Sequence, residues 1–324
     1  MKLWHRVVLS IGLLAILLVV LPWHELRAAF ARLSAPLWLG VLGGFVLGHA
    51  TGVFKWRIAV NAGRGGLAVL DGARCYAAGL FANLCLPSIV GGDVLRAALA
   101  ARITRRPEAA VWGGLVDRLS DVTALGLLIA GGALVARTAL PGLWAQLLGL
   151  AVIVAILVAA LGLPLALRRP LARWPKRIRR TVARSMVAIR RMSRRPLTAV
   201  KILVLSIIIQ SGFVLLNAAL GAGVGIHVPL AVWFLVWPLA KVASLLPISL
   251  GGLAVREASL AALLVPFGVR PSTAVAVSLV WQSVLIAGGL LGGLLWLLLK
   301  KSSARDETTE SLWHSAKATS STHG

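Results

Sequence analysis

Long apolar segments dominate this chain and constrain its fold more than any other feature. Hydrophobic residues make up 59% of its 324 residues and charged residues only 14%, whereas about a quarter of a soluble domain is charged. A helix needs about 20 apolar residues to cross the hydrocarbon core of a bilayer. The segments that we predict to span are 7–21, 36–54, 111–136, 143–167, 199–220 and 272–299. The alternating pattern of barrel strands is absent, so the sequence predicts an all-α polytopic membrane protein.

The pattern Leu-Pro-x-x-x-Gly-Gly-x-x-x-Arg occurs twice, each time at the end of a shorter apolar segment. In the first copy, after segment 73–86, the residues are Leu86, Pro87, Gly91, Gly92 and Arg96. In the second copy, after segment 230–247, they are Leu246, Pro247, Gly251, Gly252 and Arg256. Proline removes a backbone donor from a helix and glycine lets the chain turn sharply, so both copies predict a helix break. Broken helices that recur are typical of two-fold membrane transporters.

The distribution of Lys and Arg indicates how the broken segments lie in the bilayer. Residues 168–195 hold twelve Lys or Arg and no Asp or Glu, which places this run in the cytoplasm by the positive-inside rule. Simple alternation of spans from a cytoplasmic N-terminus would put it outside. The conflict disappears if 73–103 is a re-entrant hairpin that enters from inside and 230–266 is one that enters from outside. Then 26 Lys or Arg lie inside, 4 outside and 4 within or near the membrane.

The predicted architecture is therefore six full spans plus two re-entrant helical hairpins that form an inverted repeat. The integral membrane domain covers 1–301, with a cytoplasmic basic loop at 168–198, and both termini lie on the cytoplasmic side of a bacterial inner membrane. Residues 302–324 are rich in Ser and Thr and predict a disordered cytoplasmic tail. Segment 7–21 could instead be a signal peptide, but an uncleaved span is preferred because further spans follow. Lys55, just after a predicted span, is placed in a cytoplasmic loop.

Eight charged residues lie in or near apolar surroundings and are the candidate substrate-binding residues. They are Arg96, Arg256, Glu257, Asp93, Asp117, Arg118, Asp121 and Lys241. A charge at the bilayer centre costs about 3 kcal/mol on insertion scales, so such groups face a bundle interior or a wet cavity. Arg96 and Arg256 follow the two breaks by the same offset, where helix N-termini also point partial positive charge. An arginine at a helix N-terminus is well suited to bind phosphate.

Spacing predicts some of the partners of these charges. Asp93 lies three residues before Arg96, so the two share a helix face. Arg256 and Glu257 are adjacent, point in different directions and are each expected to pair elsewhere.

Two other carboxylates need a partner from outside their own helix. Asp117 and Asp121 share a face with no cation between them, and the expected partners are Arg256, Arg96 or Lys241. The alternative interpretation, that Asp117, Arg118 and Asp121 only form structural salt bridges, stays open.

Other residue types point to no metal, cofactor or nucleic acid. Cys75 and Cys85 lie in or beside one apolar segment, and the six His lack the spacing of metal ligands. The basic run lacks interleaved aromatic residues apart from Trp174, so nucleic-acid binding is not expected. Seven of the twelve tryptophans, Trp56 among them, lie near predicted span ends, which favours interface anchoring. For a second group either packing or cavity lining is open: Trp233, Trp237 and Trp281.

The motifs around the charges resemble those of the flippase-like family that includes the membrane region of lysylphosphatidylglycerol synthases. The resemblance covers roughly residues 5–300, and the segments that carry it are 83–88, 92–96, 117–121 and 247–258. The family usually has a glutamate before the first arginine and in the middle motif, where this chain has Asp93 and Asp117. The last motif is usually Gly-Leu-Gly-x-Arg-Glu, and here Ala254 replaces its last glycine.

The resemblance implies an integral inner-membrane protein that moves a lipid or helps to make one. Some relatives carry a soluble aminoacyltransferase domain, but this chain ends about 25 residues after its final predicted span, so lysyl transfer is not expected. The leading hypothesis is a translocase for an anionic phospholipid, glycolipid or polyprenyl-linked lipid. The alternative is a membrane enzyme of envelope lipid biosynthesis, with Asp93, Asp117 or Glu257 as base. A third is a non-catalytic scaffold that positions soluble partners through the basic loop, and envelope-biosynthesis proteins are candidate partners.

Overall fold

The computed structural model describes residues 27, 31–85, 91–136, 195–244 and 255–320, and all regular structure in these ranges is helical. Four helices are long and apolar enough to cross a membrane. They are α3 (Ala35–Ala62), α6 (Pro107–Val135), α9 (Pro196–Gly223) and the part Pro271–Leu299 of α12 (Pro271–Ser320). They match four of the predicted spans, while 7–21 and 143–167 lie outside the described residues. The chain is thus an all-helical membrane protein in every part that the structure describes.

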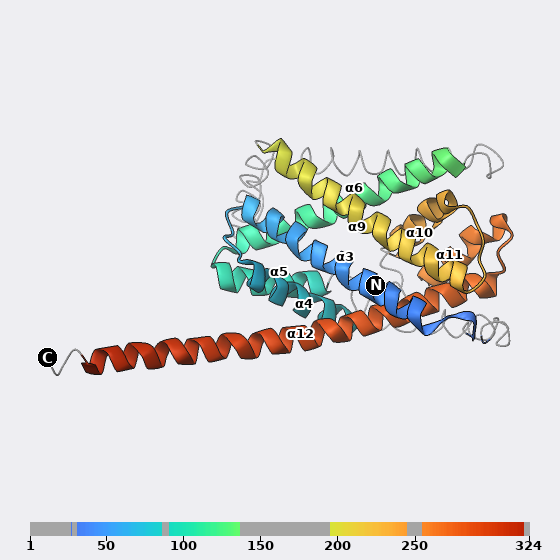
Figure 1. The fold of residues 1–324 in the computed structure, drawn as a ribbon. Helices are drawn as coiled ribbons and strands as arrows, with labels where there is room; N and C mark the ends of the chain where they lie inside the picture. The colour runs from blue at the N-terminus through green and yellow to red at the C-terminus, as the bar shows by residue number, and fades with distance from the viewer. Residues whose placement is uncertain (1–26, 28–30, 86–90, 137–194, 245–254, 321–324) are drawn as a thin grey trace, which may run out of the picture.

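Each of these four long helices has a proline in its first turn. These prolines are Pro36, Pro107, Pro196 and Pro271. The first turn suits proline because its missing N–H would have no intrahelical partner there. At 1.5 Å per residue, 28 residues of α3 measure about 42 Å, more than the ~30 Å hydrocarbon core. The long helices therefore have enough length to cross at a tilt, and Figure 1 shows them packed obliquely.

Four shorter helices form two pairs, and each pair has one copy of the repeated pattern where its first helix is followed by its second. One pair is α4 (Val69–Cys85) with α5 (Gly91–Thr104), and the other is α10 (Leu230–Ser244) with α11 (Val255–Leu264). A 3₁₀ turn, η4 (Val265–Phe267), follows α11. The two pairs lie at opposite ends of the bundle (Figure 1).

The predicted helix breaks fall partly outside the described ranges. Pro87, Pro247, Gly251 and Gly252 all lie there. The other two predicted break residues, Gly91 and Gly92, are the first residues of α5.

The same pairs of helices pack together when the first four helices are exchanged with the last four, although the extent of contact differs between some pairs. In this exchange α3, α4, α5 and α6 correspond in order to α9, α10, α11 and α12. Thus α4 packs on α12 as α10 packs on α6, and α5 packs on α6 as α11 packs on α12. Helix α3 contacts α4, α6 and α12, and α9 contacts the corresponding α10, α12 and α6, with α9 and α12 packing less extensively than α3 and α6. Helices α3 and α9 run in opposite directions, as do α6 and α12 (Figure 1), which supports the predicted inverted repeat.

The pair α4 and α5 crosses at two glycines. A Cβ atom on Gly92 would overlap the carbonyl oxygen of Gly79 and the side-chain oxygen of Asn83. The backbone N–H of Gly92 donates instead to Asn83 Oδ1, at 2.9 Å. Gly92 is therefore needed here for close helix approach rather than for a turn.

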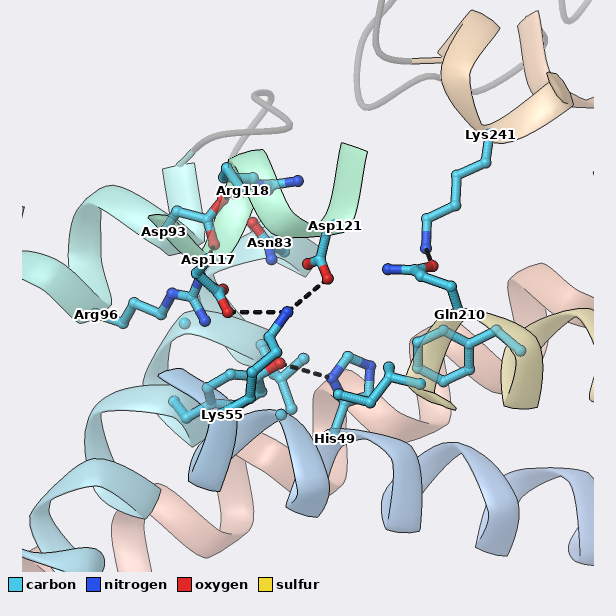
Figure 2. Close-up of a pocket in the computed structure, with 16 residues that line it drawn as sticks. His49, Lys55, Asn83, Asp93, Arg96, Asp117, Arg118, Asp121, Gln210 and Lys241 are labelled. Atoms are coloured by element: carbon cyan, nitrogen blue, oxygen red, sulfur yellow. Dashed lines mark hydrogen bonds and ion pairs between the residues drawn. The ribbon is translucent and has the colours of Figure 1, made fainter. Parts of the chain in front are cut away.

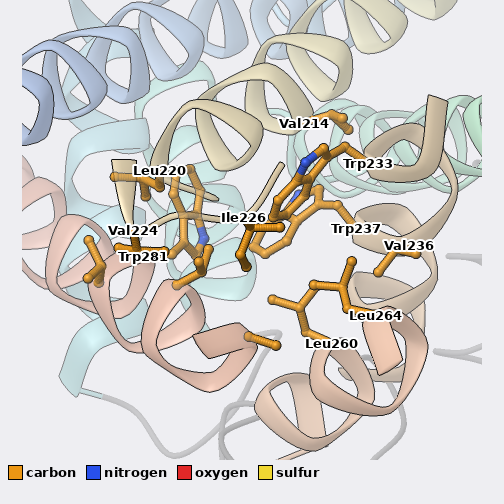
Figure 3. Close-up of a cluster of buried hydrophobic side chains, with 14 of the residues drawn as sticks. Val214, Leu220, Val224, Ile226, Trp233, Val236, Trp237, Leu260, Leu264 and Trp281 are labelled. Atoms are coloured by element: carbon orange, nitrogen blue, oxygen red, sulfur yellow. The ribbon is translucent and has the colours of Figure 1, made fainter. Parts of the chain in front are cut away.

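The largest apolar cluster lies among α9, α10, α11 and α12, with α3 against it (Figure 3). It contains the three tryptophans whose role the sequence left open. Trp233, Trp237 and Trp281 are all buried, and the rings of Trp237 and Trp281 meet edge to face with centroids 5.4 Å apart. Edge-to-face contacts of this kind add to the free energy of apolar burial. These tryptophans therefore pack the interior of the bundle.

The backbone of α12 continues as a helix to Ser320. The disordered tail expected for residues 302–324 stays a prediction. No Pro or Gly occurs between 302 and 320, so nothing in that stretch interrupts the helix that leaves the apolar span.

Candidate functional site

A polar cavity of about 150 Å³ lies among α3, α4, α5, α6, α9 and α10. Figure 2 shows side chains from these helices pointing into it. Seven charged residues line it: Lys55, Asp93, Arg96, Asp117, Arg118, Asp121 and Lys241. Four are cationic and three anionic, so the cavity carries a formal excess of one positive charge. Six of the eight residues predicted from sequence are brought together here, and Lys55 is added.

Lys55 lies at the centre of this site. Its Nζ is 2.9 Å from Asp117 Oδ1 and 2.5 Å from Asp121 Oδ1, and it donates to Ser206 Oγ at 3.0 Å. Only 3% of its side chain is exposed. The prediction of a cytoplasmic loop for Lys55 is therefore wrong. The cation that joins the two carboxylates lies on α3. The expected partners Arg96, Lys241 and Arg256 lie on other helices.

The reason for this error is that α3 continues to Ala62, beyond the predicted span end at 54. The turn after it is held by Asn61, whose side chain both accepts from the N–H and donates to the carbonyl of Leu67. A sequence signal did exist. Phe45, Gly52, Lys55 and Ala59 follow helical spacing, and all four are buried in α3. A lysine that continues an apolar stripe predicts a buried partner.

Arg96 joins α5 to α6. Its Nη2 lies 2.6 Å from Asp117 Oδ2 and 3.0 Å from Asp93 Oδ1. Its guanidinium carbon also lies 5.1 Å from the ring centroid of Trp56 and 5.0 Å from that of Tyr76. The predicted Asp93–Arg96 pair and the predicted Arg96 partner of the α6 carboxylates are both confirmed. Trp56 was predicted as an interface anchor, but it is fully buried against this cation.

The charges form one continuous chain of alternating sign. Arg118 binds the second oxygen of Asp93, so Asp93 connects two arginines, just as Asp117 connects Arg96 and Lys55. The order is Arg118, Asp93, Arg96, Asp117, Lys55 and Asp121. Paired in this way, the six charges balance one another, as buried ionic groups require.

Lys241 stands apart from this chain. Its Nζ donates to Gln210 Oε1 at 2.7 Å and lies 5.2 Å from the ring centroid of Phe213. It forms no ion pair with any residue in the described ranges. Figure 2 shows it reaching from α10 toward Gln210 on α9, on the other side of the cavity from Asp93 and Arg96. Among the described residues, Lys241 is therefore the cation of this cavity that has no carboxylate within ion-pair distance.

Arg256 and Glu257 lie outside this cavity, at the contact between α11 and α12. The expectation that they pair elsewhere is wrong, because Arg256 Nη2 lies 2.7 Å from Glu257 Oε1. Both also contact Ser278 Oγ on α12, at 3.2 and 3.1 Å, and Arg256 donates to Gln282 Oε1 at 2.9 Å. The side chains of adjacent residues leave a helix in different directions, but the arginine side chain is long enough to bend back toward the Ser278 hydroxyl that both residues contact. Only one of the two repeated arginines, Arg96, lines the polar cavity.

The charged side chains that line the site belong to Lys, Arg and Asp. Among the residues that the structure describes, no group of three or more His, Cys, Asp or Glu is placed to hold a metal ion. The arrangement can instead bind an anion of moderate size. Lys241 is placed to contact such an anion. Arg118, whose side chain is 39% exposed, lies at the more accessible end of the charge chain.

The sequence model of the lysylphosphatidylglycerol synthase TM region matches residues 4–293. This range includes every helix that lines the polar cavity. A search of curated proteins and a search of solved structures gave no match. The match covers most of the chain and agrees with the resemblance carried by the motifs around Arg96, Asp117 and Arg256. The chain therefore belongs to the family of the lysylphosphatidylglycerol synthase TM region.

Proposed function

We propose that this protein moves an anionic lipid across the inner membrane of a bacterium. The substrate is a phospholipid, glycolipid or polyprenyl-linked lipid with a negatively charged head group. The observation that carries this proposal is the polar cavity with more cations than carboxylates, enclosed by long apolar helices. A net positive cavity inside a bilayer gives an anionic head group a place to leave the water while the hydrocarbon chains of the lipid stay in apolar surroundings.

The cations differ in how they could contribute. Among the described residues Lys241 contacts the neutral side chains of Gln210 and Phe213, so an anionic head group can bind it without breaking an ion pair. Lys55 and Arg118 are held by carboxylates, and an incoming phosphate would have to compete with Asp121 or Asp93 for them. This competition limits the binding free energy and so favours release, which a transporter needs and a permanent binding site does not.

The proposal includes a membrane arrangement with two re-entrant helix pairs. The pairs α4/α5 and α10/α11 attach at opposite ends of the bundle, and the helix contacts are symmetric under exchange. Inverted repeats of this kind support alternating access to a central site. We place the connectors next to α4 and α5 in the cytoplasm, together with both termini and the basic loop at 168–198.

The test uses full-length protein in vesicles of phosphatidylcholine with fluorescently labelled phosphatidylglycerol. Access of an aqueous quencher to the label reports the rate of movement between leaflets. The variant Lys241→Gln should reduce this rate by about tenfold or more, because a hydrogen bond to a charged group contributes about 1.5–3 kcal/mol. The matched control is Lys201→Gln on α9, an exposed lysine that lines none of the three described cavities. Equal rates for wild type and Lys241→Gln would contradict the proposed role of this cavity.

A membrane enzyme of lipid biosynthesis, or an accessory subunit for one, is the second candidate. The observation that favours it is Glu257, which is 2% exposed and whose Oε2 has no hydrogen-bond partner among the described residues. Asp93 and Asp117 fit the role of base less well because each pairs with two cations, whereas Glu257 pairs with Arg256 alone among the described residues. Consumption of an activated sugar or acyl donor by the purified protein would support this candidate over transport alone.

A further inference from the structure

A second cavity lies against the polar one and differs from it in character. It has a volume of about 460 Å³, is enclosed by α3, α4 and α12, and is lined almost entirely by apolar side chains. Three residues line both cavities: His49, Tyr76 and Leu80. The polar and apolar spaces are thus separated by a single layer of side chains.

This shared wall has polar groups of its own. His49 Nδ1 lies 3.3 Å from Tyr76 Oη, which joins α3 to α4 at the boundary of the two cavities. A Cβ atom on Gly52 would overlap the Tyr76 hydroxyl, so this glycine leaves room for the contact. Amphipathic rings of this kind can face a hydrocarbon chain on one side and a polar group on the other. The wall therefore suits the part of a lipid where head group and chain are joined.

The dimensions of the apolar cavity fit one hydrocarbon chain. On α12 its lining runs from Gly288 to Leu298, which is about 15 Å at 1.5 Å per residue. This is half of the ~30 Å hydrocarbon core, the depth of one leaflet. The cavity also opens toward the bilayer, because Val46 and Phe54 are 45% and 51% exposed.

We propose that the apolar cavity holds one hydrocarbon chain of the same lipid whose anionic head group enters the polar cavity. The inference rests on the proposed lipid transport and goes further in naming how the substrate is recognised. The ligand is an amphipathic lipid bound through both parts, and a free anion such as inorganic phosphate fills only half of the site. The lipid reaches the site from the side, between α3, α4 and α12.

Photolabelling can distinguish a held chain from the bulk lipid that covers any membrane helix. The probe is phosphatidylglycerol with a diazirine on one acyl chain, in phosphatidylcholine vesicles that contain the full-length protein. After irradiation, mass spectrometry locates the labelled residues. We expect several-fold more label on the cavity faces of α3 and α12 than on the face of α9 around Val204.

Matched substitutions show whether the label depends on the cavity. Val46→Trp should fill part of it and reduce labelling several-fold, whereas Val204→Trp on α9 should not; the two positions are 45% and 46% exposed. Should Val46→Trp fail to fold, Leu295→Trp and its control Leu215→Trp, at 45% and 47% exposure, offer the same comparison. Lys241→Gln should lower labelling in the cavity but leave labelling around Val204 unchanged.

The outcomes separate this inference from the proposed function. Equal labelling of both faces, or cavity labelling that none of these substitutions changes, would show that only bulk lipid lies there and would overturn the inference. Transport by wild-type protein without preferential labelling would overturn this inference alone. No transport by wild-type protein would overturn the proposed function, whatever the pattern of labelling.

Discussion

Lys55 shows how strongly a single buried side chain can couple three helices. Its ammonium group on α3 contacts Asp117 and Asp121 on α6 and Ser206 on α9. A buried ion pair adds little net stability compared with well-packed apolar residues, but removing one partner leaves a charge uncompensated and costs about 3–5 kcal/mol. The charge chain that ends at Asp121 is therefore sensitive to the loss of any one of its members.

We expect Lys55→Met to destabilise the protein strongly and Asp121→Asn to compensate in part. The double variant removes one charge of each sign and leaves Asp117 paired with Arg96. The coupling free energy between contacting charged residues is about 0.5–3 kcal/mol, so the double variant should lose less than the sum of the single losses. Thermal unfolding in one detergent measures this, with exposed Lys201→Met as control. Strictly additive losses would show that Lys55 and Asp121 do not interact.

At the scale of the helices, close approach at glycines sets how α4 and α5 cross. Gly92 lies at the start of α5, against Gly79 and Asn83 of α4. This contact places the next turn of α5, and with it Arg96, against α6. The Gly-Gly pair of the repeated pattern predicted a sharp turn, whereas in α5 its second glycine serves helix packing. Small residues allow this in membrane helices because close backbones gain van der Waals contact.

Gly92→Ala should therefore destabilise the protein, by about 1–3 kcal/mol, because the added methyl group overlaps backbone that cannot move aside. The matched control is Gly114→Ala on α6, where a Cβ atom would meet nothing within 4 Å. That substitution should be neutral or stabilise by up to about 1 kcal/mol, since alanine favours helix more than glycine does. Melting temperatures of the two variants test the difference. Equal melting temperatures would contradict the close crossing at Gly79.

For the whole molecule, symmetric packing contrasts with an asymmetric distribution of charge. The helix contacts are preserved when α3 to α6 are exchanged with α9 to α12. Yet the alternating charge chain lies on α3, α5 and α6, whereas α9 to α12 hold the tryptophan-rich apolar cluster (Figures 2 and 3). Of the second set, α10 contributes Lys241 to the polar cavity. The two halves thus line one cavity unequally, because the first contributes six of its seven charged residues and the second contributes Lys241.

The proposed topology predicts that the connectors beside the two helix pairs face opposite sides of the membrane. Ala68, before α4, and His227, before α10, are both exposed. In a background with Cys75 and Cys85 replaced by alanine, Ala68→Cys should react with an impermeant maleimide from the cytoplasmic side alone. His227→Cys should react from the opposite side alone. Labelling of both cysteines from the same side would contradict the inverted arrangement of the pairs.

Much of the architecture could be predicted because it follows from local properties of the chain. Apolar length identified the four long helices, and the repeated pattern identified two pairs of shorter ones. The spacing of Asp93 and Arg96 predicted their pairing, since side chains three residues apart on a helix always lie close. The motifs around these residues were also sufficient to indicate the family.

The tertiary structure alone decided which distant charges meet. Sequence spacing cannot relate residues on different helices, so the contact of Lys55 with Asp121 depended on how far α3 continues and how it packs. Arg256 was separated from the cavity for the same reason, because the packing of α11 on α12 directs it to Ser278 and Gln282. The sequence by itself determined that charges lie among apolar helices and must be paired. The three-dimensional packing decides which of these charges pair, and pairing offsets the cost of removing them from water. The same packing leaves Lys241 without a carboxylate partner among the described residues.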